Sequence, residues 1–395
     1  MHRLFYLSMF FIAVNIISVV MMLSIGLLLI RPIHSKTWVK WTCVILAAII
    51  CLKVQLLYLV EGESFFTPDL PPAVVIPANW AWMTLFFYTP ILILLSLGLF
   101  LSRLCIPVLR RIDKATWNRR GNIIRLSVLG AMMLICTIGT YNALQQPEIE
   151  EITLELPSLP ANTPPVRLAL LADLPADSIA GADFMNGVVQ RTNAANPDII
   201  AIAGDFVDGS VAQFGSHLAP LDRLNAPMGV YGVEGNHELY SGYEEWRVFL
   251  ESVGVRMLDN EGISLHGGSI WLAGVRDEAE SRYKQHPINY PNAPLALHGA
   301  PAHCAKILLA HQPATFNKPE HAGADLQLSG HTHGGMMPGI RTLIARANGG
   351  YVTGLYQKSE RQIYVSRGTR LWSGWLFRLF NPAEITLITL KPAAK

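Results

Sequence analysis

The residues best suited to metal chemistry are His331 and His333, in the turn Gly-His-Thr-His-Gly-Gly at 330–335. They follow an apolar run, 324–328, that predicts a buried strand, and residues i and i+2 of an extended segment point to the same side. Each imidazole could therefore bind one of two metal ions held about 3.5 to 4 Å apart. The flanking glycines permit a sharp turn. A His-x-His pair alone could also be a surface turn, so the interpretation depends on other residues.

Six further polar residues lie within about five residues of the end of a short apolar run that predicts a strand. They are Asp173 after 168–172, Asp205 and Asp208 after 199–203, Asn236 and His237 after 230–233, and His311 after 307–310. In an open α/β sheet, ligands collect beyond the carboxyl ends of the strands. We therefore expect these side chains and the histidine pair to converge on one site.

The predicted site offers oxygen and imidazole donors without thiolates, which favours manganese, iron or zinc in a reactive centre over structural zinc. Two divalent ions, with Asp205 as a bridging carboxylate, could hold a phosphate, lower the pKa of a water and stabilise an in-line displacement. His237, next to Asn236, could protonate the leaving oxygen. Asp208 could orient His237 or a ligand imidazole. Glu238 could either begin a helix or act in the site.

The elements that must position these residues lie after residue 145. Strands are predicted at 151–156, 168–172, 199–203, 230–233, 270–275, 307–310, 324–328, 363–365 and 385–390, and helices near 182–195, 211–224 and 243–253. A proline-rich link occupies 157–165. Strands that alternate with helices predict an α/β domain with two packed sheets.

The first 144 residues have a different composition. Apolar segments at 4–30, 41–60, 80–101 and 126–144 are each long enough to cross a ~30 Å hydrocarbon layer as a helix. The first is too long for a signal-peptide core and has no cleavage site after it. We therefore expect a four-helix membrane anchor at 1–144, a strand and linker at 145–166, and a catalytic domain at 167–395.

Basic residues in the short loops predict the orientation of the anchor. The loops at 31–40 and 102–125 are rich in Lys and Arg, whereas 61–79 has none and contains Glu61, Glu63 and Asp69. Basic loops remain in the cytoplasm. The chain is thus predicted to be a multi-pass inner-membrane protein with its catalytic domain on the outer, periplasmic side.

Two polar residues lie within the spans. Lys53 could mark a transport path or a lipid-headgroup site, it could extend its amine toward the membrane surface, or it could pair with a neighbour. Asn15 could join two helices.

The ordered motifs GDxxD at 204–208, GNHE at 235–238, the lone His311 and GHTH at 330–333 resemble those of the calcineurin-like metallophosphoesterases. The resemblance covers about 150–390, and the segments at 349–356 and 364–368 look like those of the bacterial branch with N-terminal transmembrane helices. It implies a four-layer α-β-β-α sandwich with two divalent ions and with His237 near the leaving group. One ion would bind Asp173, Asp205 and His333, and the other would bind Asp205, Asn236, His311 and His331.

One residue departs from the family pattern, because Pro175 stands where a histidine ligand is usual. Water, Asp177 or a distant histidine could replace that ligand, or the first metal could be weakly held. We therefore expect a hydrolase of a phosphomonoester, phosphodiester or pyrophosphate. The alternatives are a catalytically weakened metal- or phosphate-binding or regulatory module and an enzyme of different chemistry.

Partners and secondary candidates follow from composition. Membrane lipids are expected partners, with a lipid headgroup as one candidate substrate, and the acidic balance after residue 144 argues against nucleic acid. Five histidines outside the strand ends are expected on the surface: His217, His266, His298, His303 and His321. The aromatic and basic segment 370–380 could rest on a membrane interface or belong to the core.

Overall fold

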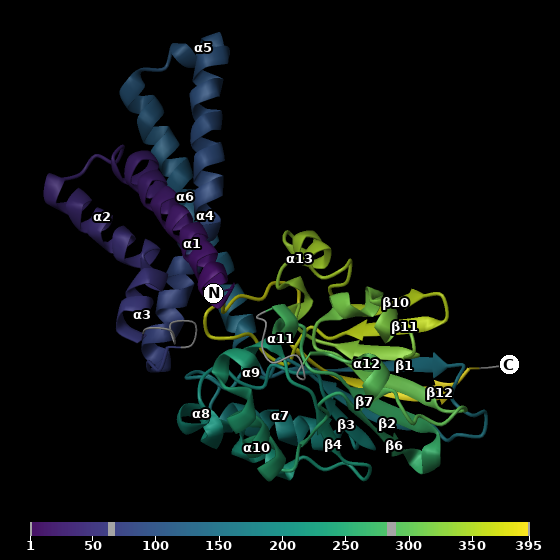
Figure 1. The fold of residues 1–395 in the computed structure, drawn as a ribbon. Coiled ribbons are helices and arrows are strands. Elements are labelled where there is room, and N and C mark those ends of the chain that lie inside the picture. The colour runs from purple at the N-terminus through teal and green to yellow at the C-terminus, as the bar shows by residue number, and fades with distance from the viewer. Residues whose placement is uncertain (1, 62–67, 283–289, 394–395) are drawn as a thin grey trace. The chain divides into compact units, whose positions relative to one another are not determined.

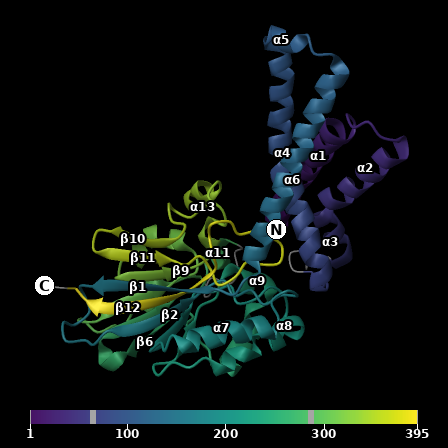
Figure 2. The same cartoon turned by 180° about the vertical axis from the view of Figure 1, so that it is seen from behind.

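The computed structural model describes residues 2–61, 68–282 and 290–393 (Figures 1 and 2). The chain forms two compact units, Met1–Tyr141 and Asn142–Lys395. Each has its own packed interior, so each is described by itself.

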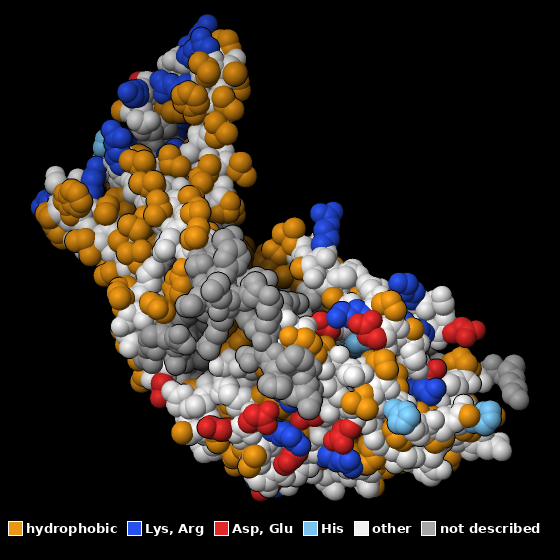
Figure 3. All heavy atoms as spheres, viewed as in Figure 1, with side chains coloured by type: hydrophobic (Ala, Val, Ile, Leu, Met, Phe, Trp, Pro, Cys, Tyr) orange, Lys and Arg blue, Asp and Glu red, His pale blue; other side chains and the backbone are white. Residues whose placement is uncertain are grey.

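The first unit is a set of apolar helices. They are α1 (His2–Ser24) with its π-helical continuation η1 (Ile25–Ile30), α2 (Thr37–Cys51), α3 (Lys53–Glu61), α4 (Pro72–Cys105), α5 (Pro107–Arg110) and α6 (Lys114–Ala143). Among the described residues, three helices could cross a membrane, at 11–30, 72–105 and 114–143, and a fourth span results if α2 and α3 are taken together. α2 and α3 meet at a 64° bend. Hydrophobic side chains cover much of the surface of these helices (Figure 3).

Polar side chains inside this unit join neighbouring helices. Gln55 Nε2 donates hydrogen bonds to Asn15 Oδ1 at 2.9 Å and to Ser18 Oγ at 3.0 Å. Lys53 is buried, and its Nζ donates to Asn79 Oδ1 at 2.6 Å. Asn15 thus lies between helices as predicted, and Lys53 pairs with a neighbour, which was one of its open alternatives.

The second unit contains two six-stranded mixed sheets. The first has the order β1 (Glu148–Leu156), β12 (Glu384–Pro392), β2 (Val166–Leu171), β3 (Ile199–Ile202), β4 (Val230–Gly232) and β5 (Arg256–Met257). The second has the order β10 (Gly354–Lys358), β11 (Arg361–Val365), β9 (Leu326–Ser329), β8 (Ala305–Leu309), β7 (Ile270–Gly274) and β6 (Glu261–Leu265). Strands β2 to β5 run parallel, as do β11, β9, β8 and β7.

The main core lies between the sheets, where Leu168 and Ile199 of the first share one buried cluster with Ile307 and Leu328 of the second. The outer face of the first sheet packs on α7 (Ala182–Ala194), α8 (Val211–Leu218) and α10 (Tyr243–Ser252), and that of the second on α12 (Ala293–Ala296). The predicted order of helix, sheet, sheet and helix is therefore confirmed.

Some elements differ from the prediction. β1 is an edge strand of the first sheet, paired in parallel with β12, although the sequence placed it ahead of the domain. β5, β6 and β10 were not predicted, since they are short or lack apolar alternation and are defined by pairing with distant strands. The short helices α9 (Asn236–Ser241), α11 (Ala279–Arg282) and α13 (Arg341–Ala347) were also not predicted.

Candidate metal centre

The predicted site residues follow the carboxyl ends of five strands. β2, β3 and β4 are adjacent parallel strands of the first sheet, and β8 and β9 are adjacent parallel strands of the second. The residues that follow them are Asp173 after β2, Asp205 after β3, Asn236 after β4, His311 after β8, and His331 and His333 after β9. Parallel pairing therefore brings the strand ends of each sheet to one edge.

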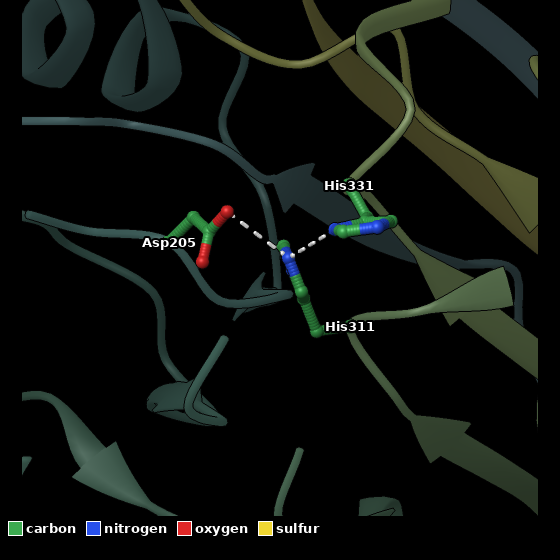
Figure 4. A group of neighbouring side chains, drawn as sticks. All are labelled: Asp205, His311 and His331. Atoms are coloured by element: carbon green, nitrogen blue, oxygen red, sulfur yellow. Dashed lines mark hydrogen bonds and ion pairs between the residues drawn. The ribbon is translucent and has the colours of Figure 1, made fainter. Parts of the chain in front are cut away.

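Three of these side chains form a tight group, Asp205, His311 and His331 (Figure 4). His311 Nε2 lies 3.1 Å from Asp205 Oδ2 and 3.2 Å from His331 Nδ1. The three potential ligand atoms all lie within 4.8 Å of one another. A carboxylate with two imidazoles is a common donor set for a divalent transition metal.

Backbone carbonyls fix the tautomers of two of the histidines. His311 Nδ1 lies 2.7 Å from the carbonyl oxygen of Ala203, and His333 Nδ1 lies 3.1 Å from that of Arg370. Because a carbonyl only accepts, Nδ1 carries the hydrogen in both rings, which leaves the Nε2 lone pair available in the neutral form. Burial lowers the pKa of His333 well below its usual value, so this ring is neutral.

The electrostatics of the group favour positive charge. Burial lowers the pKa of His311, but the carboxylates of Asp205 and Asp173 outweigh burial and hold that pKa well above its usual value. Burial raises the pKa of Asp173 to about 7. A proton or a metal cation would thus be attracted to the same place.

Asp173 and Asn236 complete the candidate donor set. Both oxygens of Asp173 accept from the backbone N–H of His331, at 3.0 and 3.2 Å. Among the described residues, Asn236 Oδ1 is buried without a hydrogen-bond partner. A Cβ on Gly368 would lie 2.8 Å from Asp173 Oδ2 and 3.2 Å from His333 Nδ1, so only glycine fits beside these donors. The residues present therefore fit divalent cations.

His237 is held beside this group by Asp208. Its Nδ1 contacts Asp208 Oδ1, its backbone N–H donates to Asp205 Oδ1 at 2.9 Å, and its Nε2 lies 3.8 Å from Asp205 Oδ2. Burial lowers the pKa of His237, but Asp205 and Asp208 raise it overall to about 10. The ring is therefore protonated at neutral pH, with its Nε2–H on the side of the metal-binding group. Asp208 thus contacts His237, which was one of the two partners that the sequence left open.

Glu238 organises two of the loops that carry the donors. Its Oε1 accepts from the backbone N–H groups of Phe206 and Val207, at 2.6 and 3.2 Å. Its Oε2 accepts from those of Asp205 and Gly235, at 3.0 and 2.6 Å. Glu238 is the third residue of α9, so it does lie in the first turn of a helix. It is also fully buried and ties the Asp205 loop to the Gly235 loop, a role that sequence reasoning left open.

The segment after β11 contributes residues that sequence reasoning did not assign to the site. Asn381 Nδ2 donates to the carbonyl of His333 at 2.7 Å, and Arg378 donates to the same carbonyl at 3.5 Å. The ring of Trp372 lies 5.2 Å from His333 and 6.2 Å from His237, measured between centroids. The aromatic residues of this segment were the one sequence feature that could have drawn attention to it. Their type and spacing do not show that the segment contacts the site.

The segment 370–380 therefore does not act as one surface. Arg370, Phe377 and Arg378 are buried, whereas Phe380 is 82% exposed. His321 was expected on the surface, but it is buried with Nδ1 3.3 Å from Gln327 Oε1. That prediction is wrong because the buried side-chain amide of Gln327, in β9, supplies a partner for the ring.

The neighbourhood of Pro175 shows what Asp177 does. Arg370 Nη1 donates to the carbonyl of Pro175 at 3.1 Å and to Asp177 Oδ1 at 2.9 Å. The same oxygen accepts from the backbone N–H groups of Ile179 and Ala180, both at 2.8 Å. Asp177 Oδ1 is thus committed to a buried ion pair and a turn, whereas Oδ2 is buried without a hydrogen-bond partner among the described residues. Asp177 therefore stays one of the alternatives for the ligand that Pro175 lacks.

Known proteins resemble the chain over most of its length. The family described as "Calcineurin-like phosphoesterase" matches residues 166–335. An "Uncharacterized metallophosphoesterase" of Helicobacter pylori (strain J99) is 34% identical over 286 residues, which cover 71% of this chain and 75% of that protein. A "Transmembrane protein with metallophosphoesterase domain" of Danio rerio is 30% identical over 355 residues, which cover 85% of this chain and 79% of that protein. Among solved structures, a 5'-nucleotidase precursor from Thermus thermophilus is 15% identical with a TM-score of 0.37, over 57% of this chain and 55% of that one.

Proposed function

The chain belongs to the calcineurin-like phosphoesterase family, and we propose that its Asn142–Lys395 unit hydrolyses a phosphomonoester, phosphodiester or pyrophosphate with bound divalent metal ions. The observation that carries the proposal is the convergence of Asp205, His311 and His331 within 4.8 Å of one another, from three separate strand ends. Carboxylates and imidazoles that meet at strand ends form a site for cations, which would take the place of the bound proton.

Two overlapping sets of residues would hold the ions. We assign Asp173, Asp205 and His333 to one ion, and Asp205, Asn236, His311 and His331 to the other. Bound divalent ions would neutralise phosphate oxygens and lower the pKa of the attacking water. Their identity is left to experiment, with manganese, iron and zinc as the candidates.

The remaining residues of the site orient groups and move a proton. Asp208 fixes His237 through Nδ1, so Nε2–H is the atom that can protonate the departing oxygen. Glu238 fixes the position of the Asp205 loop relative to the Gly235–Asn236 turn, because one of its oxygens accepts from both. Trp372 provides an apolar wall beside His237 and His333, which limits the access of water.

Metal-dependent turnover by the purified full chain tests this function. With manganese present, the chain should hydrolyse an aryl phosphate monoester or diester, and Asp205→Asn should remove that turnover because the shared carboxylate is lost. Asp222→Asn, at a side chain that is 61% exposed, is the matched control and should keep it. Equal turnover by Asp205→Asn and the control would exclude this site.

A catalytically weakened binding or regulatory module is the second candidate. Pro175 has no donor side chain, and Oδ1 of Asp177 is engaged by Arg370. The Asp173 side of the centre then has fewer ligands, so one ion could bind while the other is lost. Metal analysis separates the candidates, because the hydrolase requires two ions per chain and turnover, and the module requires one or none without turnover.

We further propose that the apolar helices anchor the chain in the inner membrane with the catalytic unit on the periplasmic side. Lys and Arg side chains gather where the first unit carries α5 and the start of α2, which supports a cytoplasmic position for that end (Figure 3). A reporter fused after residue 150 should be active only outside the cytoplasm. Activity inside would reverse the orientation.

A membrane anchor also bears on the substrate, because lipid phosphates and lipid-linked pyrophosphates are concentrated near the bilayer. We propose this class, with membrane lipids as partners and no role for nucleic acid. The lipids of cells with the intact protein, compared with those of cells carrying Asp205→Asn, should differ in a phosphorylated lipid. Unchanged lipids would direct the search to soluble esters.

A further inference from the structure

Lys53 is a cation in an apolar unit with neutral partners. Its side chain is buried, with Nζ donating to Asn79 Oδ1 at 2.6 Å and lying 5.1 Å from the ring centroid of Trp82. Among the described residues it forms no ion pair with a carboxylate, in contrast to the buried Arg370 of the second unit, which pairs with Asp177. A charge left without a counter-ion in a membrane is costly, and such residues commonly mark functional sites.

The bend between α2 and α3 sets the depth of this cation. α2 has 15 residues and α3 has 9, which correspond to about 22 Å and 13 Å of helix. If α2 lies along the membrane normal, the 64° bend reduces the rise of α3 along that normal to about 6 Å. Together the two helices then cover about 28 Å of a ~30 Å layer. Lys53 is the first residue of α3, so in that orientation it would lie about 6 Å below one surface of the layer rather than at its centre.

An anion is available at that depth. The headgroup phosphates of lipids lie just above the hydrocarbon surface, within reach of a flexible lysine stem. An ammonium group has three N–H donors, one of which goes to Asn79 and one of which can face Trp82. A donor remains for a phosphate oxygen.

We propose that Lys53, held by Asn79 and Trp82 at the break between α2 and α3, binds a phosphate oxyanion of a membrane-lipid headgroup. The lipid would supply the counter-ion that the described side chains do not. This site is separate from the metal centre, and it requires binding alone, so it stands whether or not the second unit hydrolyses phosphate esters.

Native mass spectrometry of the full chain, purified in detergent and titrated with phosphatidylglycerol, tests the proposal. Lys53→Gln should bind phosphatidylglycerol about 10- to 100-fold more weakly, as expected for the loss of one charge-assisted hydrogen bond. Lys36→Gln is the matched control, since Lys36 is an exposed lysine one residue before α2, and it should bind like the wild type. Equal binding by Lys53→Gln and the wild type would overturn the proposal.

A second variant guards against misfolding. Asn79→Asp keeps the shape of the amide and gives Lys53 a permanent carboxylate partner, so it should preserve the melting temperature while weakening phosphatidylglycerol binding at least tenfold. Unchanged lipid binding by Asn79→Asp would show that the ammonium has only a structural role. Inorganic phosphate at millimolar concentration should not displace the lipid, and displacement would identify a site for free phosphate and overturn the lipid assignment.

Discussion

Replacing Glu238 by Gln tests whether one buried carboxylate holds two loops of the metal centre together. The two oxygens of Glu238 accept four backbone N–H groups, from Asp205, Phe206, Val207 and Gly235. Glutamine has the same shape, but one oxygen becomes an NH₂ group that cannot accept. Two buried N–H groups then lose their acceptor.

The expected cost follows from those two groups. Each buried N–H left without an acceptor costs about 1 to 3 kcal/mol, so Glu238→Gln should destabilise the second unit by about 2 to 6 kcal/mol. Since a typical domain is stable by about 5 to 15 kcal/mol, this loss is large but compatible with folding. Manganese affinity should also fall, because the Asp205 loop and the Gly235–Asn236 turn lose their shared anchor.

Pulse proteolysis of the full chain in urea measures the stability of the second unit through the fraction that survives. Glu245→Gln, at an exposed position in α10, is the matched control and should unfold with the wild type. Manganese titration of the same samples measures the affinity of the metal centre for manganese. If Glu238→Gln unfolds at the same urea concentration as the control, the inferred role of this carboxylate is wrong.

Four further predictions concern the chemistry of the centre. His331→Ala should lower manganese-dependent turnover by more than about 100-fold, whereas His298→Ala, outside the strand ends, should not, and a steady-state assay compares them. Pro175→His should raise the number of metal ions per chain, measured by elemental analysis, because it adds a donor beside Asp173; unchanged metal content would mean that another group already fills that position. His237→Asn should lower kcat by about 10² to 10⁴ with metal content retained, and a lost metal would mean a different role for the ring. The pKa of His237 is raised to about 10, partly by Asp208, so the acid form persists until the pH passes that value. Asp208→Asn should therefore move the alkaline limb of the pH–kcat profile to lower pH, and an unmoved limb would contradict the assignment of His237 as the acid.

The sequence alone determined the parts of the site that local pattern encodes. Short apolar runs predicted β2, β3, β4, β8 and β9, and the polar residue after each run indicated where donors would gather. Strand periodicity is a local property, and parallel pairing places strand ends at one edge, so these inferences needed no coordinates. The apolar segments of the first unit could be located for the same reason.

Only the tertiary structure decided which groups support those donors. Glu238 accepts from Asp205 across 33 positions, and Asn381 donates to the carbonyl of His333 across 48. Such contacts depend on how loops from different strands meet, and neither residue type nor spacing specifies that meeting. For the same reason the sequence did not predict that His321 is buried, since its partner Gln327 is known only from the fold. It also did not predict the contact of Asp177 with Arg370, which lies 193 positions away in the chain.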